Sequence, residues 1–389
     1  MVVALVSPGQ GAQKPGFLTP WLELPGVREK LSWWSQLAQV DLVELGSKAD
    51  ADAIRRTDAT QPLLAAAALI AAAELPLGDV TITAGHSIGE LPAAAIAGAL
   101  SADTAIALAG ARGREMAKAC ELAETSMIAV VGGQADEVLT AIQAAGATAA
   151  NRNSPGQVVA AGPIAALEKL KANPPAKARL IPLQVAGAFH TDAMITAQTA
   201  LSEFASALEV STPQKILLSN ADGAAVTSGK DTINRLIAQV TSSVRWDLCQ
   251  ETMKDLGVTA LIELPPAGTL VGLAKRTMPG VEVLSINTPD DLILARDLIA
   301  RHGVHPTGEP SVQFSVATAS VKGHFAPLAE LNEGDAVAAG DTIGHIDTRQ
   351  GPVPVTAPTK GVLVEWVAHP RDPVAPGHTL ARLTPGGAA

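Results

Sequence analysis

Short apolar runs alternate with longer alanine-rich segments from Val2 to about His302. Short runs of β-branched and aliphatic residues are typical of buried strands, and long alanine-rich stretches are typical of helices. The pattern predicts strands at residues 2–6, 80–84, 216–219 and 260–264. Strands that alternate with helices in this way indicate an α/β domain built on a largely parallel sheet.

The pattern changes between about residues 126 and 185. Strands are predicted at 127–131, 158–161 and 179–183, and helices at 136–145 and 164–171. The order strand, helix, strand, helix, strand is that of a split βαβ unit. We therefore expect a ferredoxin-like subdomain, inserted at about residues 126–188, with a ligand-binding cleft between it and the larger domain.

A second domain is predicted at the C-terminal end of the chain. Glycines and prolines at positions 303, 306, 308 and 310 predict a linker over residues 303–310, which ends the first domain at residue 302. From residue 311 to 389, short strands alternate with turn sequences, and no helical period is visible. This segment predicts a small all-β barrel or sandwich, in which residues 333–337 and 372–378 look like two halves of one repeat.

Composition limits the classes of partner. The formal net charge is -10 and no lysine or arginine run is present, which argues against nucleic acid and anionic membranes as partners. The longest apolar stretch, residues 63–75, is shorter than the roughly 20 residues that a membrane helix needs. Two distant cysteines, Cys120 and Cys249, predict neither a disulfide framework nor a metal site. We expect a cytoplasmic protein without a bound metal.

A candidate nucleophile lies between the second predicted strand and a helix predicted over residues 90–100. The sequence there is Gly85-His86-Ser87-Ile88-Gly89, the GxSxG pattern of a nucleophile elbow. Its glycines allow a sharp turn that exposes the serine oxygen at a helix N-terminus. Such a turn suits acyl transfer, although a chain with 34 glycines can also contain GxSxG in an ordinary turn.

His190 is the best candidate for the base that would activate Ser87. It follows the apolar stretch 181–189 and precedes a predicted helix, so it lies in a loop between a strand and a helix. The alternative is a histidine with a purely structural role. No aspartate or glutamate stands out as a third catalytic residue, which favours a dyad whose histidine is oriented by a main-chain carbonyl.

Two further features bear on substrate binding. Arg112 lies on an otherwise apolar face of a helix predicted over residues 104–120, and a buried guanidinium requires an anion from either the protein or a substrate. The loop at residues 7–13, Ser-Pro-Gly-Gln-Gly-Ala-Gln, directly follows the first strand, where α/β sheets bind ligands. Its amides could complete an oxyanion hole. A phosphate loop is poorly supported, and a simple turn is the remaining alternative.

Taken together, these motifs resemble the malonyl-CoA:acyl carrier protein transacylase family over about residues 1–302. The resemblance also includes NRNSPGQVV at 151–159, Gly-Ala-Phe-His at 187–190, and Pro-Pro-Ala-Gly at 265–268. It implies a hydrolase-like α/β fold with an inserted ferredoxin-like subdomain, malonyl-CoA as the substrate, and acyl carrier protein as the partner. Many members carry Pro-Ser-His where this chain has Ala188-Phe189-His190, and malonyl remains the favoured acyl group.

The same resemblance implies roles for particular residues. Ser87 would be the acylated nucleophile, His190 the general base, and Arg112 the clamp for the free carboxylate of malonate. The main-chain amides of Gln10 and Ile88 would form the oxyanion hole. The carbonyl of Gln239 would orient the histidine. The alternatives to malonyl transfer are a serine esterase or thioesterase, and an acyltransferase-derived scaffold for other proteins.

Residues 311–385 resemble the biotinyl and lipoyl carrier module. The resemblance rests on the turns Glu333-Gly334-Asp335 and Gly340-Asp341, on Ala-Pro-Thr-Lys-Gly-Val at 357–362, and on Pro-Gly at 376–377. In that family a lysine at a hairpin tip carries the biotin or lipoyl group, and the matching position here is Gln350. Because an amide cannot be acylated in this way, no biotin or lipoate and no other permanent cofactor is expected. The module would then be a structural element or dock another protein.

Overall fold

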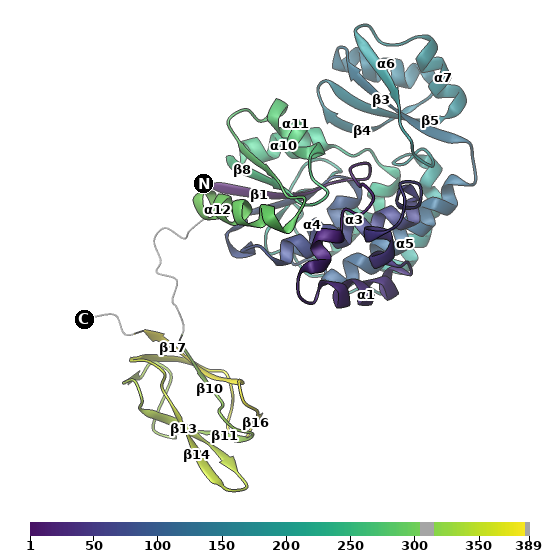
Figure 1. Ribbon diagram of the computed structural model, residues 1–389. Helices are drawn as coiled ribbons and strands as arrows, with labels where there is room; N and C mark the ends of the chain where they lie inside the picture. Colours follow the sequence, from purple (N-terminus) through teal and green to yellow (C-terminus); the bar gives the residue numbers. More distant parts are fainter. Residues whose placement is uncertain (304–314, 386–389) are drawn as a thin grey trace. The chain divides into compact units, whose positions relative to one another are not determined.

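The computed structural model describes residues 1–303 and 315–385 (Figure 1). The chain divides into two compact units, Met1–Val304 and His305–Ala389. Apart from Gly303, the predicted linker at 303–310 lies outside the described residues, as do residues 386–389. Among the residues that are described, no helix has the length and hydrophobicity needed to cross a membrane.

The first unit is built on a five-stranded sheet in which all neighbouring strands are parallel. Its order is β7-β2-β1-β8-β9, and the strands are β1 (Val2–Ser7), β2 (Ile82–Gly85), β7 (Ile216–Leu217), β8 (Val258–Glu263) and β9 (Glu282–Ser285). Side chains alternate across β1, so that Val3 and Leu5 join one apolar cluster while Ala4 and Val6 join another. The predicted parallel α/β fold is confirmed, although β2 and β7 are shorter than predicted.

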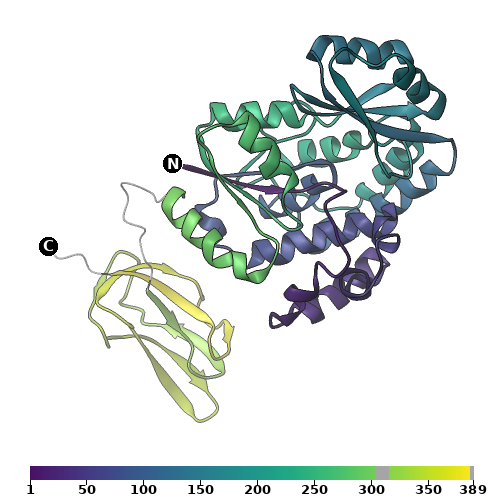
Figure 2. The ribbon, with the colours of Figure 1, turned by 45° about the horizontal axis from the view of Figure 1, so that its top comes forward.

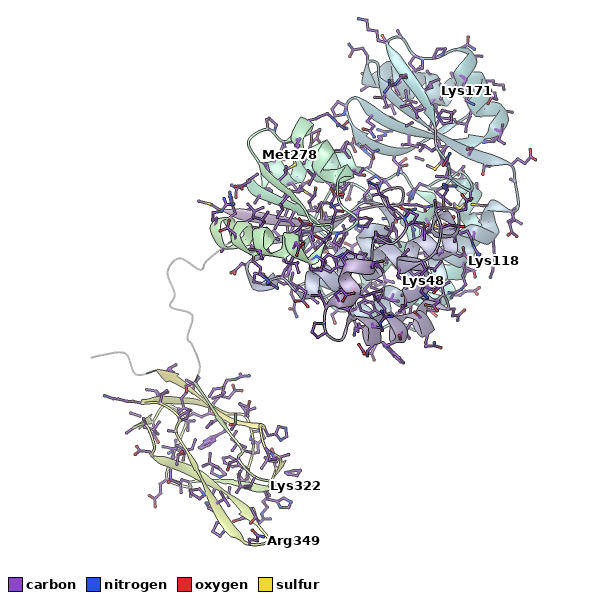
Figure 3. The ribbon with its side chains drawn as sticks, viewed as in Figure 1. Lys48, Lys118, Lys171, Met278, Lys322 and Arg349 are labelled. Carbon is purple, nitrogen blue, oxygen red and sulfur yellow. The ribbon has the colours of Figure 1, made fainter. Side chains whose placement is uncertain are left out.

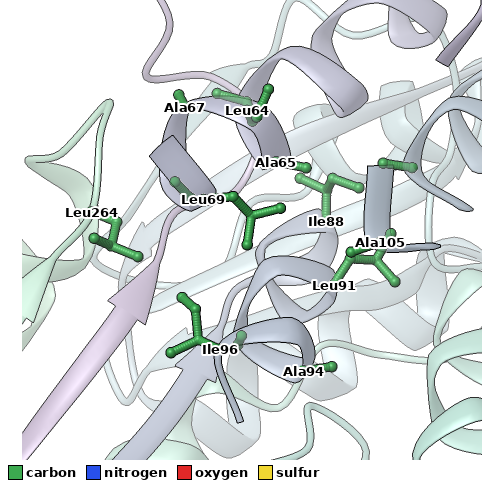
Figure 4. Packing of buried hydrophobic residues seen from close by; sticks show 14 of the residues in the cluster. Leu64, Ala65, Ala67, Leu69, Ile88, Leu91, Ala94, Ile96, Ala105 and Leu264 are labelled. Atoms are coloured by element: carbon green, nitrogen blue, oxygen red, sulfur yellow. The ribbon is translucent and has the colours of Figure 1, made fainter. Parts of the chain in front are cut away.

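Helices cover both faces of this sheet, as the turned view in Figure 2 shows. The larger cluster joins one face to α1 (Val27–Ala38), α2 (Leu42–Ser47), α3 (Thr57–Ala73), α4 (Glu90–Ile96), α5 (Ala102–Cys120), α8 (Ile195–Ala205), α9 (Gly229–Ala238) and α12 (Leu292–His302). The smaller cluster joins the other face to α10 (Trp246–Asp255) and α11 (Thr269–Thr277). Figure 4 shows part of the larger cluster, where Ile88 and Leu91 pack among alanines of neighbouring helices.

Small residues bring α5 close to α3. A Cβ atom at Gly113 would lie 2.9 Å from the carbonyl oxygen of Thr57, so this position has no room for a larger residue. Close packing of this kind fixes α5, and with it the neighbouring Arg112, relative to the start of α3.

The inserted subdomain has four strands, where the sequence predicted three. Its elements are β3 (Thr125–Gly132), α6 (Ala135–Ala145), β4 (Thr148–Ser154), β5 (Gln157–Pro163), α7 (Ile164–Ala172) and β6 (Ala178–Pro182), with antiparallel sheet order β4-β5-β3-β6. The prediction missed β4 because its sequence, TAANRNS, contains no apolar run. The arrangement β-α-β-β-α-β is ferredoxin-like, as expected.

The second unit is all-β. Two four-stranded antiparallel sheets have the orders β10-β17-β15-β12 and β14-β13-β11-β16. The strands are β10 (Ser315–Thr318), β11 (Gly323–Pro327), β12 (Ala336–Val337), β13 (Thr342–Thr348), β14 (Gly351–Thr356), β15 (Gly361–Trp366), β16 (Pro373–Val374) and β17 (Thr379–Pro385). The two proposed repeat halves each contain a two-residue strand, β12 or β16, at the end of its sheet.

The hairpin of β13 and β14 pairs Thr348 with Gly351, so Arg349 and Gln350 form its tip. Figure 3 labels Arg349 at this end of the hairpin. Inside the unit, Phe325 is completely buried and packs against Trp366, with ring centroids 5.6 Å apart.

Candidate active site

Ser87 lies in a sharp turn between β2 and α4. Its φ angle is 53°, in the left-handed region that residues with side chains seldom adopt. A Cβ atom at Gly85 would collide with the carbonyl of Gly89, and one at Gly89 would collide with the carbonyl of Ser7. Both flanking positions therefore require glycine, and the turn packs directly against the end of β1.

His190 lies beside Ser87, 103 positions away in sequence. The Oγ of Ser87 is 2.7 Å from Nε2 of His190, and Nδ1 of His190 is 2.8 Å from the main-chain oxygen of Gln239. A carbonyl oxygen can only accept, so Nδ1 carries the proton and Nε2 accepts the hydroxyl of Ser87. Burial, and then the charge of Arg112, lower the pKa of His190 to about 3, so its imidazole is neutral.

Arg112 also reaches the serine. One of its Nη atoms is 3.3 Å from the Oγ of Ser87 and 3.0 Å from Oε1 of Gln239, and the other is 2.7 Å from Oε1 of Gln61. The side chain is 3% exposed, and burial lowers its pKa to about 10. Among the described residues it forms no ion pair with a carboxylate. Its protein partners are the amide oxygens of Gln61 and Gln239 and the hydroxyl of Ser87.

Gln239 connects these groups through its side chain as well as its main chain. Its Nε2 donates to the main-chain oxygen of Ser87 at 3.0 Å and to the carboxylate of Glu90. Glu90 is 2% exposed, and burial raises its pKa to about 7. The same Nε2 lies 3.1 Å from Oδ1 of Asn220. Sequence reasoning missed Glu90, Gln61 and Asn220 as members of this network. Glu90 directly follows the GxSxG sequence and could have been found there, whereas Gln61 and Asn220 lie in none of the motifs named above.

Gln10 and Ile88 line the same cavity as Ser87. Within the described residues, the main-chain N–H of neither residue has a protein acceptor. Ile88 is the second residue of a 3-10 turn, Ser87–Gly89, whose first amides have no partner inside the turn. Two free N–H groups in the cavity that holds the serine oxygen are the kind of donors that an oxyanion hole requires.

The cavity around Ser87 has a volume of about 290 Å³ and is lined by both parts of the first unit. Met127, Asn153 and Gln157 of the inserted sheet contribute to its wall, so the missed strand β4 supplies polar groups to the site. His86 points toward this sheet, with Nε2 2.9 Å from Oδ1 of Asn153. A larger apolar cavity of about 450 Å³, between α1, α3 and α4, contains none of the candidate site residues.

Comparison with known proteins agrees with this geometry. Residues 6–288 match the family model of the acyl transferase domain. A malonyl CoA-acyl carrier protein transacylase of Mycolicibacterium smegmatis is 50% identical over 283 residues, which are 71% of this chain and 98% of that protein. The chain belongs to the malonyl-CoA:acyl carrier protein transacylase family. No part of this conclusion depends on the second unit.

Solved transacylase structures share the fold of the first unit. The crystal structure of MCAT from Mycobacterium tuberculosis has 47% sequence identity and a TM-score of 0.75, and the match covers 76% of this chain and 100% of that one. A malonyl-transacylase in complex with its type II PKS acyl-carrier protein has 29% identity and a TM-score of 0.71, over 76% of this chain and 99% of that one.

The family match ends before the second unit, so it does not test whether the hairpin of β13 and β14 can carry a group. An attached biotin or lipoyl group requires an amine at the tip, which instead consists of Arg349 and Gln350. An amide is not nucleophilic, and a guanidinium remains protonated. Lys360 is exposed but lies between β14 and β15, away from this tip. The tip residues therefore do not fit an attached biotin or lipoyl group.

Proposed function

We propose that this chain transfers a malonyl group from malonyl-CoA to the phosphopantetheine thiol of an acyl carrier protein through a malonyl-serine intermediate. The observation that carries the proposal is the buried guanidinium of Arg112, 3.3 Å from the Oγ of Ser87 and without a carboxylate partner among the described residues. A free carboxylate on an acyl group bound to Ser87 would supply that partner. The named relatives support both the donor and the acceptor.

The first half-reaction acylates the serine. The Oγ of Ser87 attacks the thioester carbonyl of malonyl-CoA while Nε2 of His190 takes the hydroxyl proton. The main-chain N–H groups of Gln10 and Ile88 stabilise the oxyanion, a contribution of about 3 kcal/mol per donor. The C–S bond then breaks, and the CoA thiolate leaves with the proton from His190. The Gln239 carbonyl holds the imidazole in place throughout, in both its neutral and its protonated form.

The second half-reaction reverses these roles with a new thiol. His190 takes the proton of the phosphopantetheine thiol, whose sulfur attacks the malonyl ester on Ser87. The same two N–H groups stabilise the second oxyanion. When the C–O bond breaks, the proton returns from His190 to the Oγ of Ser87, and the free enzyme is restored. Every proton moves between named groups, and no cofactor takes part.

The proposal extends to the rest of the protein. No permanently bound cofactor is required, and the second unit acts as a structural element or docks another protein. A cytoplasmic location fits the two free cysteines, Cys120 and Cys249, neither of which forms a disulfide among the described residues.

Intact-protein mass spectrometry after incubation with malonyl-CoA tests the proposal. We expect one malonyl adduct on Ser87, loss of the adduct after addition of a carrier protein with its phosphopantetheine arm, and no adduct in Ser87→Ala. A Ser87→Ala protein that still transfers malonyl would disprove the assignment. Rapid release of free malonate without any thiol acceptor would indicate a thioesterase, and complete absence of an adduct a scaffold. A biotin or lipoyl mass on residues 315–385 would contradict the expected lack of modification.

A further inference from the structure

A single side chain holds the main chain on both sides of the residue that precedes Ser87. Nδ2 of Asn220 donates to the main-chain oxygen of Gly85 at 2.7 Å, and Oδ1 accepts the main-chain N–H of Ser87 at 2.8 Å. The carbonyl can only accept and the N–H can only donate, so the orientation of the Asn220 amide is fixed by its partners. The two peptide groups that flank His86 are thus joined through one amide.

Asn220 is itself held firmly. It is completely buried, shortly after β7, the strand that neighbours β2. Its main-chain N–H donates to Oε1 of Glu90 at 3.2 Å, and its carbonyl accepts the main-chain N–H of Arg245 at 2.8 Å. Its Oδ1 also accepts Nε2 of Gln239 at 3.1 Å. A side chain with this many fixed partners can impose its geometry on the turn that it contacts.

The turn requires such support. Ser87 has a φ angle of 53°, and residues with side chains stay in this region only when the surrounding structure holds them there. The direction of the Ser87 side chain, and therefore the 2.7 Å contact of its Oγ with His190, depends on that main-chain conformation.

We propose that Asn220 is a positioning residue for Ser87. It acts through its hydrogen bonds to Gly85 and Ser87, which keep the serine oxygen in line with Nε2 of His190, and it does not itself touch the substrate. This inference rests on the proposed function, because it takes Ser87 to be the nucleophile.

The test measures how fast Ser87 becomes acylated by malonyl-CoA in rapid-quench experiments read by intact mass. Asn220→Ala removes both bonds to the turn, and we expect the maximal rate constant of acylation to fall about 100-fold, a loss that displacing a reacting group by about 1 Å can cause. The malonyl-CoA concentration at half-maximal rate should change far less, because Arg112, which binds the carboxylate, remains in place.

Asn220→Asp provides a second variant with a different signature. An ionised aspartate still accepts the N–H of Ser87 but repels the carbonyl of Gly85, whereas a protonated one can donate to that carbonyl. The acylation rate of this variant relative to the wild type should therefore rise as the pH is lowered. The titratable groups in contact with Asn220 are Glu90, which accepts its main-chain N–H, and Cys249, whose Sγ lies 3.9 Å from Nδ2, while the charge of Arg112 acts on Glu90. Because a new carboxylate would titrate together with Glu90, the same comparison is repeated with Glu90→Gln in both proteins.

Trp21→Phe is the matched control for lost stability. It removes a partly buried hydrogen bond, from Nε1 of Trp21 to the main-chain oxygen of Asn287 at 3.1 Å, that does not involve the turn. Thermal melts of all variants show which are folded. If Asn220→Ala does not fold, the positioning role is tested with Asn220→Asp alone.

The possible results separate the two proposals. A wild-type protein without an adduct on Ser87 would disprove the proposed function. If the wild type is acylated while folded Asn220 variants are acylated as fast as Trp21→Phe, the positioning role of Asn220 is refuted. A loss confined to the maximal rate constant, with recovery of Asn220→Asp at low pH, supports it.

Discussion

Replacing Arg112 with alanine should remove the preference for malonyl over acetyl groups. The guanidinium is buried, lies 3.3 Å from the Oγ of Ser87, and has amide oxygens of Gln61 and Gln239 as its protein partners. Its charge is therefore not neutralised by a direct ion pair, although Glu90 lies close enough to interact with it, and it can attract a carboxylate carried by the acyl group. An acetyl group has no carboxylate, so its transfer should change much less.

The size of the effect follows from the burial of this charge. Two unit charges about 4 Å apart attract by about 4 kcal/mol at an effective dielectric constant of about 20. Removing one partner of a buried charge pair costs about 3–5 kcal/mol, which agrees with that value. Since each 1.36 kcal/mol is a factor of ten, the ratio of kcat/KM for malonyl-CoA to that for acetyl-CoA should fall about 10²- to 10⁴-fold.

The assay compares transfer from the two CoA thioesters to a carrier protein. Arg112→Lys keeps the charge but loses the planar fork, so its loss of selectivity should be smaller than that of Arg112→Ala. Arg114→Ala is the control, because Arg114 lies on the same helix and donates to the main-chain oxygen of Ala38 at 2.6 Å. An unchanged selectivity ratio in Arg112→Ala would refute the clamp.

Three further predictions concern the base and the stability of the two units. Because the pKa of His190 is lowered to about 3, kcat/KM should lack the acid limb of an ordinary histidine with pKa about 6.5. A half-loss of activity near pH 6.5 that persists in Glu90→Gln would contradict this. Glu263 accepts three main-chain N–H groups at the start of α11, so Glu263→Ala should lower the free energy of unfolding in urea by at least about 3 kcal/mol. A decrease under about 1 kcal/mol would count against this reasoning. Phe325→Ala should cost about 3–5 kcal/mol and lower the Tm of the second unit in calorimetry, and an unshifted transition would show that this residue does not anchor its core.

Much of the fold and part of the candidate site could be predicted from the sequence. The alternation of strands and helices predicted the parallel sheet because buried strands and alanine-rich helices differ in residue type over their whole length. Ser87 was identifiable because its turn needs glycine on both sides, and Arg112 because one cation on an apolar helix face is unusual. In both cases the signal was local.

The parts that escaped prediction depend on contacts between distant segments. The strand β4 is recognisable from its pairing with β5, not from its own polar residues. Asn220 reaches a turn 133 positions away, and an asparagine after a short strand has no special meaning by itself. For Gln239, the family resemblance indicated its main-chain carbonyl, while its side-chain bonds to Arg112 and Glu90 required the folded structure.

Gln239 contacts His190 through its main chain and Arg112 through its side chain. The carbonyl that orients His190 is present whatever amino acid occupies position 239, whereas the oxygen that faces Arg112 belongs to the glutamine alone. A substitution at position 239 can therefore change what Arg112 contacts while the main-chain carbonyl that faces His190 stays the same. The same side chain also donates to the main-chain oxygen of Ser87, so a substitution that changes the surroundings of Arg112 also removes a hydrogen bond from the nucleophile turn.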